Sequence, residues 1–254
     1  FFDVDEIWTL PHFSRNVGYL KTLYNNKNVK VMPYVWDSKF IDILLKKNGF
    51  QDRNDFITEA RRSAHPKNLN IYEPNNTVSK TSLLPLAIAV EHRRHGKEKL
   101  YKCNVFCTEK IVRSKYFIRL CNSLDVVKDP TYFAFHKRLE ILNSLKLYGL
   151  NSIIASHQLA HELNNLYFDV FYLGLPLLHN SNILSSHGYF FPESDTIEAA
   201  RQIDMIIENY NIDFDLIDNE NMNLLDSYSP YNSKNMSAYE EAIYRLVNCT
   251  KDST

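Results

Sequence analysis

From residue 68 to residue 178, short apolar runs alternate with longer amphipathic stretches. The pattern predicts strands at 68–72, 99–106, 131–135, 152–155 and 176–178, and helices at 80–94, 110–122, 137–148 and 163–172. Such alternation is typical of βαβ units, which build a mostly parallel sheet. Right-handed crossovers then give an α/β, doubly wound domain over about residues 66–210. A sheet of this kind binds ligands beyond the carboxyl ends of its strands, where the strand order reverses.

The flanking segments carry further elements. The pattern predicts strands at 6–10 and 28–33, and helices at 15–24, 38–47, 196–210 and 238–248. Residues 52–64 are polar, and we interpret them as a linking segment that is helical or irregular.

The composition is that of an ordinary globular chain and narrows the function by exclusion. Of the 254 residues, 44% are hydrophobic and 23% are charged, and the formal net charge is -1. This charge gives no basic field for nucleic acid or an anionic membrane. Only 6 glycines occur, and no G-x-G-x-x-G, G-x-x-x-x-G-K-[ST] or G-x-S-x-G motif is present. A standard dinucleotide-binding fold, a P-loop nucleotide hydrolase and an α/β-hydrolase are therefore disfavoured.

Cysteine usage and hydropathy favour a cytoplasmic protein. The 4 cysteines form no C-x-x-C pair, which is typical of a reduced, intracellular chain. The longest apolar stretches, at 83–90 and 170–178, are too short to span a bilayer. No signal-peptide pattern is present at the N-terminus. Because the chain begins at Phe1 without an initiator Met, we expect it to be a piece of a longer polypeptide.

The segment after the first strand of the series is a candidate anion site. Pro74 stops the strand, and Asn75 and Asn76 suit a turn. Lys80 and Thr81 are then expected at the start of the next helix. A lysine and hydroxyls at a helix N-terminus can bind an anion without glycine. The alternative is a solvated lysine beside a Ser/Thr cap.

Histidines after a later strand raise the question of a metal. His157 and His161 are four positions apart, so they share a face if this segment is helical. A histidine-metal hydrolase therefore stays an alternative. No H-E-x-x-H motif and no clear third ligand occur, and we expect neither a metal nor a cofactor.

The order of the motifs resembles the nucleotide-sugar-binding C-terminal domain of two-domain GT-B glycosyltransferases. In their large retaining branch, the first turn carries a lysine that contacts the donor diphosphate, and Lys80 matches it. An arginine precedes that lysine in the branch, whereas Asn75 and Asn76 stand in its region here. A glutamate that holds the donor ribose lies five residues before G-x-P, and Asp169 lies five before Gly174.

A closer likeness is to an uncharacterised bacterial and giant-virus family of GT-B-like proteins. Its motifs W-x-x-P, P-x-x-W-[DS], E-P-N with K-T, S-H-Q and G-x-P-L-x-H-N-S all occur here in order, over about residues 5–200. The resemblance implies a nucleotide-sugar site but assigns no catalytic residue. The implied binding residues are Asn75, Asn76, Lys80, Thr81, His157, His161, Glu162, Asn165, Asp169, His179, Asn180 and Ser181.

The resemblance also implies a division of the chain and a function. Residues 1–40 would be the remnant of an N-terminal acceptor domain with the crossing segment, 41–65 a linker, 66–210 the nucleotide-sugar-binding domain and 211–254 a helical extension. The implied reaction is metal-independent transfer of a sugar, hexosyltransferase-like, from a nucleoside-diphosphate sugar to an unknown glycan, protein or lipid. The implied partners are the nucleotide sugar, the acceptor and the missing N-terminal domain, without nucleic acid or a transmembrane segment. The alternative is a non-catalytic nucleotide-sugar-binding or interaction module.

Overall fold

The computed structural model describes residues 4–25, 27–62, 65–97, 99–124, 126 and 129–249. The chain divides into two compact units, and each is considered by itself. Unit 1 comprises Phe1–Asp37 and Asn223–Thr254, and unit 2 comprises Ser38–Met222. Phe1, residues 63–64 of the expected linker and residues 250–254 of the expected extension lie outside the described residues. The four-part functional division stays a prediction.

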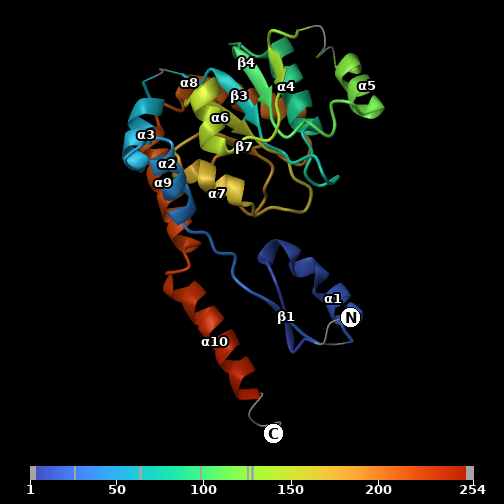
Figure 1. Ribbon diagram of the computed structural model, residues 1–254, viewed down its shortest axis with the longest axis vertical. Helices are drawn as coiled ribbons and strands as arrows, with labels where there is room; N and C mark the ends of the chain where they lie inside the picture. The colour runs from blue at the N-terminus through green and yellow to red at the C-terminus, as the bar shows by residue number, and fades with distance from the viewer. Residues whose placement is uncertain are drawn as a thin grey trace. The chain divides into compact units, whose positions relative to one another are not determined.

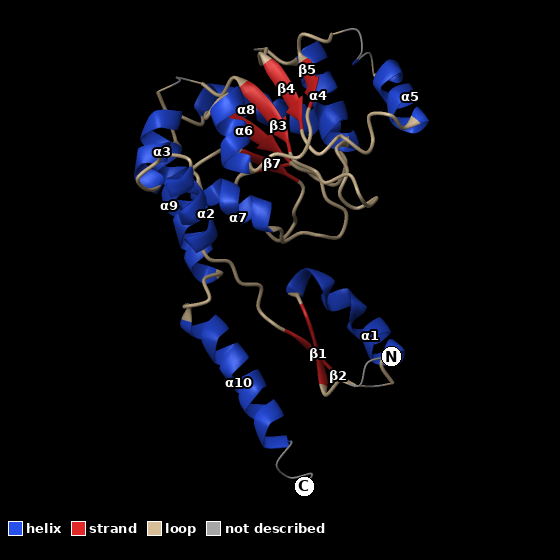
Figure 2. Cartoon of the chain, in the orientation of Figure 1, coloured by secondary structure: helices blue, strands red, loops and turns tan. Residues whose placement is uncertain are grey.

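Unit 2 is built around a six-stranded sheet in which every pair of neighbouring strands is parallel (Figure 2). The order across the sheet is β5 (Phe133–Phe135), β4 (Lys102–Val105), β3 (Asn68–Ile71), β6 (Ser152–Ala155), β7 (Leu177–His179) and β8 (Tyr189–Phe190). The chain runs outward from β3 to β5, returns to the middle at β6 and runs outward again to β8. The strand order therefore reverses between β3 and β6, which confirms the doubly wound, Rossmann-like fold.

The apolar side chains of the two central strands are buried because both faces of the sheet are covered. Leu69, Ile71, Ile153 and Ile154 are fully buried. In the register of β3 and β6, Asn68 pairs with Ser152 and Ile71 with Ala155. Both strands thus end at the same level, and the segments that follow them leave the sheet side by side.

Helices flank this sheet (Figure 1). They are α2 (Lys39–Lys47), α3 (Arg53–Ala60), α4 (Leu83–His95), α5 (Lys115–Ser123), α6 (Ile141–Tyr148), α7 (Asn165–Tyr172), α8 (Thr196–Asn209) and the first part of α9 (Phe214–Ser227). The polar segment expected to link forms α3, because the Asp52 carboxylate caps it by accepting from the Asp55 N–H at 2.9 Å.

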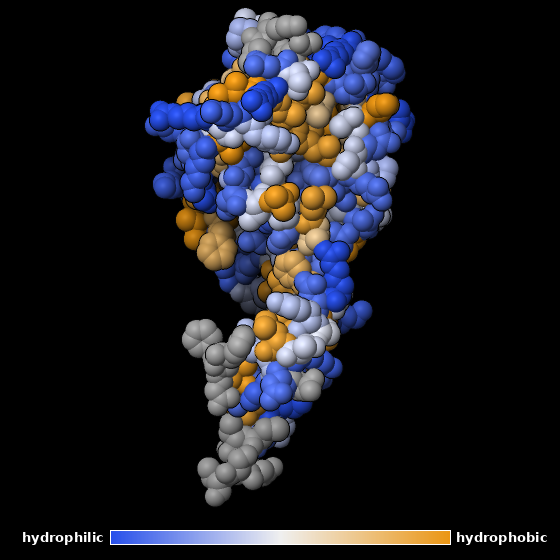
Figure 3. Space-filling model, turned by 90° about the vertical axis from the view of Figure 1, so that its right-hand side faces the viewer, coloured by the Kyte–Doolittle hydropathy of each residue, from blue (hydrophilic) through white to orange (hydrophobic). Residues whose placement is uncertain are grey.

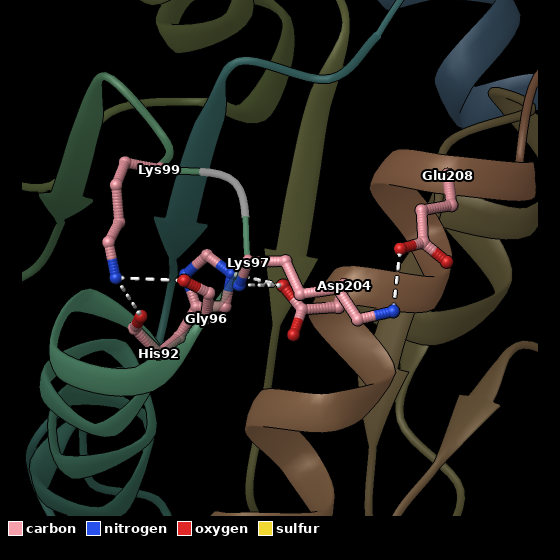
Figure 4. A network of polar contacts seen from close by, with 6 residues as sticks. All are labelled: His92, Gly96, Lys97, Lys99, Asp204 and Glu208. Atoms are coloured by element: carbon pink, nitrogen blue, oxygen red, sulfur yellow. Dashed lines mark hydrogen bonds and ion pairs between the residues drawn. The ribbon is translucent and has the colours of Figure 1, made fainter.

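A polar network joins α4 to α8 (Figure 4). His92 is fully buried, and its Nε2 donates to Asp204 Oδ1 at 3.2 Å. The same carboxylate oxygen accepts from the Lys97 N–H at 3.0 Å, and Lys97 Nζ lies 2.9 Å from Glu208 Oε1. Burial lowers the pKa of His92, so the ring is a neutral donor. The network fixes the C-terminal end of α4, the end opposite the loop that follows β3.

The sequence pattern does not predict α9. Its apolar positions include Phe214 and Leu225, both buried, but the stripe is interrupted at Asn221, which is only 2% exposed. A buried asparagine in an otherwise apolar stripe weakens the helical periodicity on which the prediction depends.

Unit 1 contains a short parallel pair, β1 (Glu6–Thr9) and β2 (Asn28–Val31), joined through the 3-10 helix η1 (Pro11–Asn16) and α1 (Val17–Leu23). It also contains the end of α9 and the helix α10 (Ser233–Cys249). Tyr239 ties α10 to the N-terminal segment, because its hydroxyl donates to the Pro33 carbonyl at 2.8 Å and its ring packs edge-on against Trp8.

Exposed hydrophobic residues lie in patches among hydrophilic ones on the face drawn in Figure 3. Among the described residues, no helix combines the length and apolarity needed to cross a bilayer.

Candidate nucleotide-binding site

A pocket of about 440 Å³ opens in unit 2 where the central strands end. It is lined by the segments that follow β3, β4 and β6, by the segment before α6, and by α2 and α7. Since β4, β3 and β6 are neighbours around the reversal of strand order, the pocket lies where doubly wound sheets bind ligands. Its charged side chains are Glu73, Lys80, Arg138, Glu140 and Asp169.

Three loops at this edge contain a non-glycine residue in the left-handed region. They are Asn75 (φ 54°) after β3, Cys107 (φ 58°) after β4 and Ala160 (φ 61°) after β6. Side chains other than glycine adopt this conformation at a cost, and such residues cluster at functional sites. The edge of the sheet is thus shaped by tight turns although the chain has few glycines.

Asn75 fastens the loop after β3. Its Nδ2 donates to the carbonyls of Glu73 and Cys107, at 2.9 and 3.3 Å. Its Oδ1 accepts from both the N–H and the hydroxyl of Ser82, at 2.8 and 2.9 Å. These contacts use the amide on both sides, so Asn75 shapes the pocket through the loop backbone. It is not among the residues that line the pocket.

Lys80 lines the pocket, but it does so from a loop, and its predicted position at a helix start is wrong. Helix α4 begins at Leu83, because Pro85 lies in its first turn and the proline ring excludes a helical residue four positions earlier. The Lys80 main chain instead bridges to Gln158, and its carbonyl accepts from the Asn75 N–H at 3.1 Å. The lysine is therefore fixed between the loops that follow β3 and β6.

Arg138 brings a second cation to the pocket, which the sequence analysis missed. The predicted helix at 137–148 begins only at Ile141, with Glu140 as its N-cap, so Arg138 lies in the loop that follows β5. Arg138 could have been identified from the sequence, because it closely follows the predicted strand at 131–135 and ligand-binding residues were expected just after the strands. Within the part of the chain that the structure describes, neither the Arg138 guanidinium nor the Lys80 ammonium forms a hydrogen bond or ion pair.

Cys107 lies beside this arginine and also lines the pocket. Burial raises the pKa of the Cys107 thiol, and the Arg138 charge partly offsets that rise. The thiol is therefore protonated at neutral pH and serves as part of the pocket wall.

Glu73 lies at the point where β3 meets the pocket and is only 1% exposed. The Ser156 hydroxyl, from the end of β6, donates to its Oε1. Its Oε2 has no partner with hydrogen-bond geometry among the described residues. Burial raises the pKa of Glu73 to about 7, although the Ser156 hydroxyl and the Lys80 charge favour the ionised form. The sequence analysis did not assign this residue to the site.

Asp169 reaches the pocket from α7. The helix is capped by Asn164, whose Oδ1 accepts from the Leu166 N–H at 3.3 Å. Neighbouring positions of α7 such as Phe168 and Val170 are fully buried, which leaves Asp169 half-buried on the pocket side. The helix ends at Tyr172, and the chain turns at Gly174, whose φ of +60° is a conformation that other residues rarely adopt.

Asn180 and Ser181 fasten the loops that follow β6 and β7. The Asn180 amide pairs with the Gln158 main chain, accepting from its N–H at 2.9 Å and donating to its carbonyl at 3.0 Å. The Ser181 hydroxyl donates to the Glu162 carbonyl at 2.7 Å, and the Glu162 carboxylate accepts from Asn182 at 3.0 Å. These predicted binding residues are engaged in the protein and lie outside the pocket lining.

The three predicted histidines have different surroundings. His179 is fully buried, with Nε2 donating to the His187 carbonyl at 2.8 Å and Nδ1 accepting from the Ser181 N–H at 3.1 Å. Burial lowers its pKa to about 4, so the ring is neutral. His157 lies 3.4 Å from the Ser194 hydroxyl, and burial lowers its pKa. The pKa of His161 is lowered by burial and then by the charge of nearby Lys80.

The remaining predicted residues are Asn76, Thr81 and Asn165. Asn76 and Asn165 are exposed, and none of the three lines the pocket. Of the twelve predicted binding residues, Lys80 and Asp169 are the two that the pocket brings together.

The segment that contains His157 and His161 is not helical, so the condition for a shared helix face is not met. Helix α7 begins only at Asn165, and Ala160 between the histidines is left-handed. No group of three or more His, Cys, Asp or Glu suited to a metal ion was found among the described residues.

Comparisons with known proteins place this fold. A crystal structure of an S. aureus TarM variant, in complex with fondaparinux, alpha-GlcNAc-glycerol and UDP, matches with a TM-score of 0.61 at 9% sequence identity. TarM is a GT-B glycosyltransferase. The match covers 94% of this chain but 43% of the TarM chain, so the present chain spans less than half of that protein. A search of curated proteins found no match.

The sheet order and this likeness define a protein with a Rossmann-like GT-B fold. A likeness at 9% identity concerns the fold and not the reaction. The chain belongs to the family described as protein of unknown function (DUF2827), whose family model matches residues 3–243. The closer likeness to a bacterial and giant-virus family stays a prediction.

Proposed function

We propose that the protein binds a nucleoside-diphosphate sugar in the unit 2 pocket and is the donor-binding part of a glycosyltransferase. The observation that carries the proposal is the presence of two cations, Lys80 and Arg138, in the lining of one pocket at the reversal of strand order. Neither side chain forms a hydrogen bond or ion pair with the described residues. The volume of about 440 Å³ falls in the usual range of small-molecule sites, roughly 300–1,000 Å³.

The cations suit the diphosphate of such a donor. A guanidinium donates two parallel hydrogen bonds to phosphate oxygens, and an ammonium adds a compact charge. As the bond between sugar and diphosphate breaks, negative charge grows on the departing phosphate, and preorganised cations stabilise it. Lys80 and Arg138 would supply this stabilisation without a divalent metal.

Asp169 suits the ribose. An ionised carboxylate has two oxygens that accept hydrogen bonds, so it can accept from both ribose hydroxyls at once. Its place on α7, in the same pocket as the two cations, fits a ligand that carries a ribose and a diphosphate together. The presence of UDP in the TarM complex supports this ligand class, whereas the sugar and the acceptor stay unassigned.

A thermal-shift panel tests the proposal. UDP, GDP, ADP, their glucose or mannose conjugates and inorganic phosphate would each be added to the protein. A ligand at a hundred times its Kd stabilises the folded state by about 2.7 kcal/mol. We expect at least one diphosphate to raise the Tm of the wild-type protein and of Lys115→Ala, whose lysine is exposed at the start of α5. Absence of a shift with every nucleoside diphosphate would overturn the proposal.

Activity separates the two classes of function that share this site. Release of free sugar or its transfer from the stabilising donor indicates a glycosyltransferase. Binding with no consumption of donor, in the presence of candidate glycan, protein and lipid acceptors, indicates the non-catalytic module.

A further inference from the structure

Glu73 is an acid at the floor of the pocket for which the proposed donor chemistry gives no role. Its carboxyl group is almost wholly removed from water, and its Oε1 accepts a hydrogen bond from the Ser156 hydroxyl. The other oxygen, Oε2, is buried without such a partner among the described residues. A buried carboxylate in this situation depends on nearby charge for its ionised form.

The groups around Glu73 come from four segments. Lys80 lines the same pocket from the loop after β3, and its charge favours the ionised form of Glu73. The His157 N–H and the Gln158 amide, after β6, do so to a lesser degree. The pKa values of Cys107, after β4, and Tyr167, on α7, are both raised, mainly by burial and to a lesser degree by the Glu73 charge. Lys80 is therefore the cation that compensates Glu73. The other pocket charges, on Arg138, Glu140 and Asp169, line the same cavity.

Lys80 cannot compensate two anions fully. A diphosphate bound at Lys80 draws the ammonium charge to itself and adds negative charge close to the buried carboxyl group. Both changes disfavour ionised Glu73. The other groups that favour ionised Glu73 are the Ser156 hydroxyl, the His157 N–H and the Gln158 amide, which are neutral and cannot replace the lost charge.

Building on the proposed function, we propose that Glu73 acts through Lys80 as a positioning residue, and that the pocket takes up one proton at Glu73 when it binds a diphosphate. The proton comes from the solvent and bonds to a carboxylate oxygen, with Oε2 the oxygen that is available. In the neutral state, Glu73 no longer competes with the ligand for Lys80, so the ammonium group is free to contact phosphate. Donor affinity is thereby coupled to pH.

The starting pKa supports this coupling, since burial already raises the pKa of Glu73 to about 7. A neighbouring anion raises it further. At pH values between the pKa of Glu73 in the free protein and its higher pKa in the complex, the complex holds up to one proton more than the free protein. Affinity for a diphosphate should therefore be highest below pH 7 and fall as the pH rises above 7.

Calorimetric titration tests the inference with UDP-glucose or GDP-mannose, whichever stabilises the protein in the panel. Both probes lack a phosphate group that titrates near pH 7. Titrations at pH 6, 7 and 8, in two buffers of different ionisation enthalpy, count the protons taken up. We expect the wild-type Kd to weaken on the order of tenfold from pH 6 to pH 8, with net uptake of up to one proton. Glu73→Gln should take up none and bind at all three pH values as the wild type does at pH 6.

A second variant separates Glu73 from His161, a titratable group whose pKa is lowered by burial and by the Lys80 charge. His161→Gln should keep the wild-type pH dependence, although its absolute affinity is free to differ. Persistence of the full pH dependence in Glu73→Gln, or its loss in His161→Gln alone, overturns the inference and leaves nucleotide binding intact. If Glu73 only holds two loops together through Ser156, Glu73→Gln changes the Kd equally at every pH, which also overturns it. Failure of the wild type to bind any probe at any pH overturns the proposed function as well.

Discussion

Glu73→Gln should make the free energy of unfolding less dependent on pH. Burial raises the pKa of Glu73 from 4.5 to about 7 in the folded protein. The folded state therefore holds a proton more tightly than the unfolded chain does. Its contribution to stability is fully present below pH 4.5 and is lost as the pH rises through 7. The rise in the pKa from 4.5 to about 7 corresponds to about 3 kcal/mol, at about 1.4 kcal/mol per pKa unit.

Urea denaturation at pH 4.5, 6, 7 and 8 measures this effect. Glutamine keeps an oxygen that accepts from the Ser156 hydroxyl, so the variant should fold with the same contacts. The stability of Glu73→Gln relative to wild type should rise by about 3 kcal/mol between pH 4.5 and pH 8. Glu109→Gln, which changes an exposed acid in the loop after β4, should show no such rise. A Glu73→Gln difference that stays constant across the range would refute the assignment of a raised pKa to this carboxyl group.

Three further predictions concern the ligand site and the fold. Asp169→Asn should weaken binding of UDP or the selected nucleoside diphosphate by about 1–3 kcal/mol and leave the affinity for inorganic pyrophosphate unchanged. An equal loss of affinity for both ligands, with a lower Tm, would exclude the ribose role. Binding measured with EDTA should match binding with Mn²⁺ or Mg²⁺, and a tenfold gain with metal would contradict a site based on Lys80 and Arg138. Asp204→Ala should lower the free energy of unfolding by about 1–3 kcal/mol, because it leaves the buried His92 donor unpaired. Its ligand Kd should stay at the wild-type value, and a change would show that the α4–α8 network reaches the pocket.

Most of the sheet could be predicted from the sequence because its strands are short, carry buried apolar residues and are regularly spaced. The exception is the two-residue strand β8, which was not among the predicted strands. The predicted strand at 152–155 coincides with β6, and 68–72 differs from β3 by one residue. Helix starts were less predictable, since they depend on single side-chain contacts. Asn75 holds Ser82 as the residue before α4, and Glu140 holds the start of α6, so both helices begin three or four residues later than the pattern predicts.

The candidate site shows the same limit. Lys80 and Asp169 could be named because each follows a motif at a fixed spacing, and both line the pocket. Arg138 belongs to no motif, and only the observed end of β5 places it in a loop at the pocket. Glu73 was part of a quoted motif, but its burial and its contact with Ser156, 83 residues away in sequence, depend on two strands that are adjacent in the sheet.

The most direct test of the account is calorimetric titration of the nucleoside diphosphate selected by the panel into four proteins at pH 6.5. These are the wild type, Lys80→Ala, Arg138→Ala and the control Lys115→Ala. A charge-assisted hydrogen bond contributes about 1.5–3 kcal/mol, so each pocket variant should bind roughly ten- to a hundredfold more weakly. Lys115→Ala should match the wild type. All four should melt at similar temperatures, because neither pocket cation forms a hydrogen bond or ion pair with the described residues and Glu73 is mostly protonated at pH 6.5. Unchanged affinity in both Lys80→Ala and Arg138→Ala would show that the diphosphate does not bind in this pocket and would contradict the account.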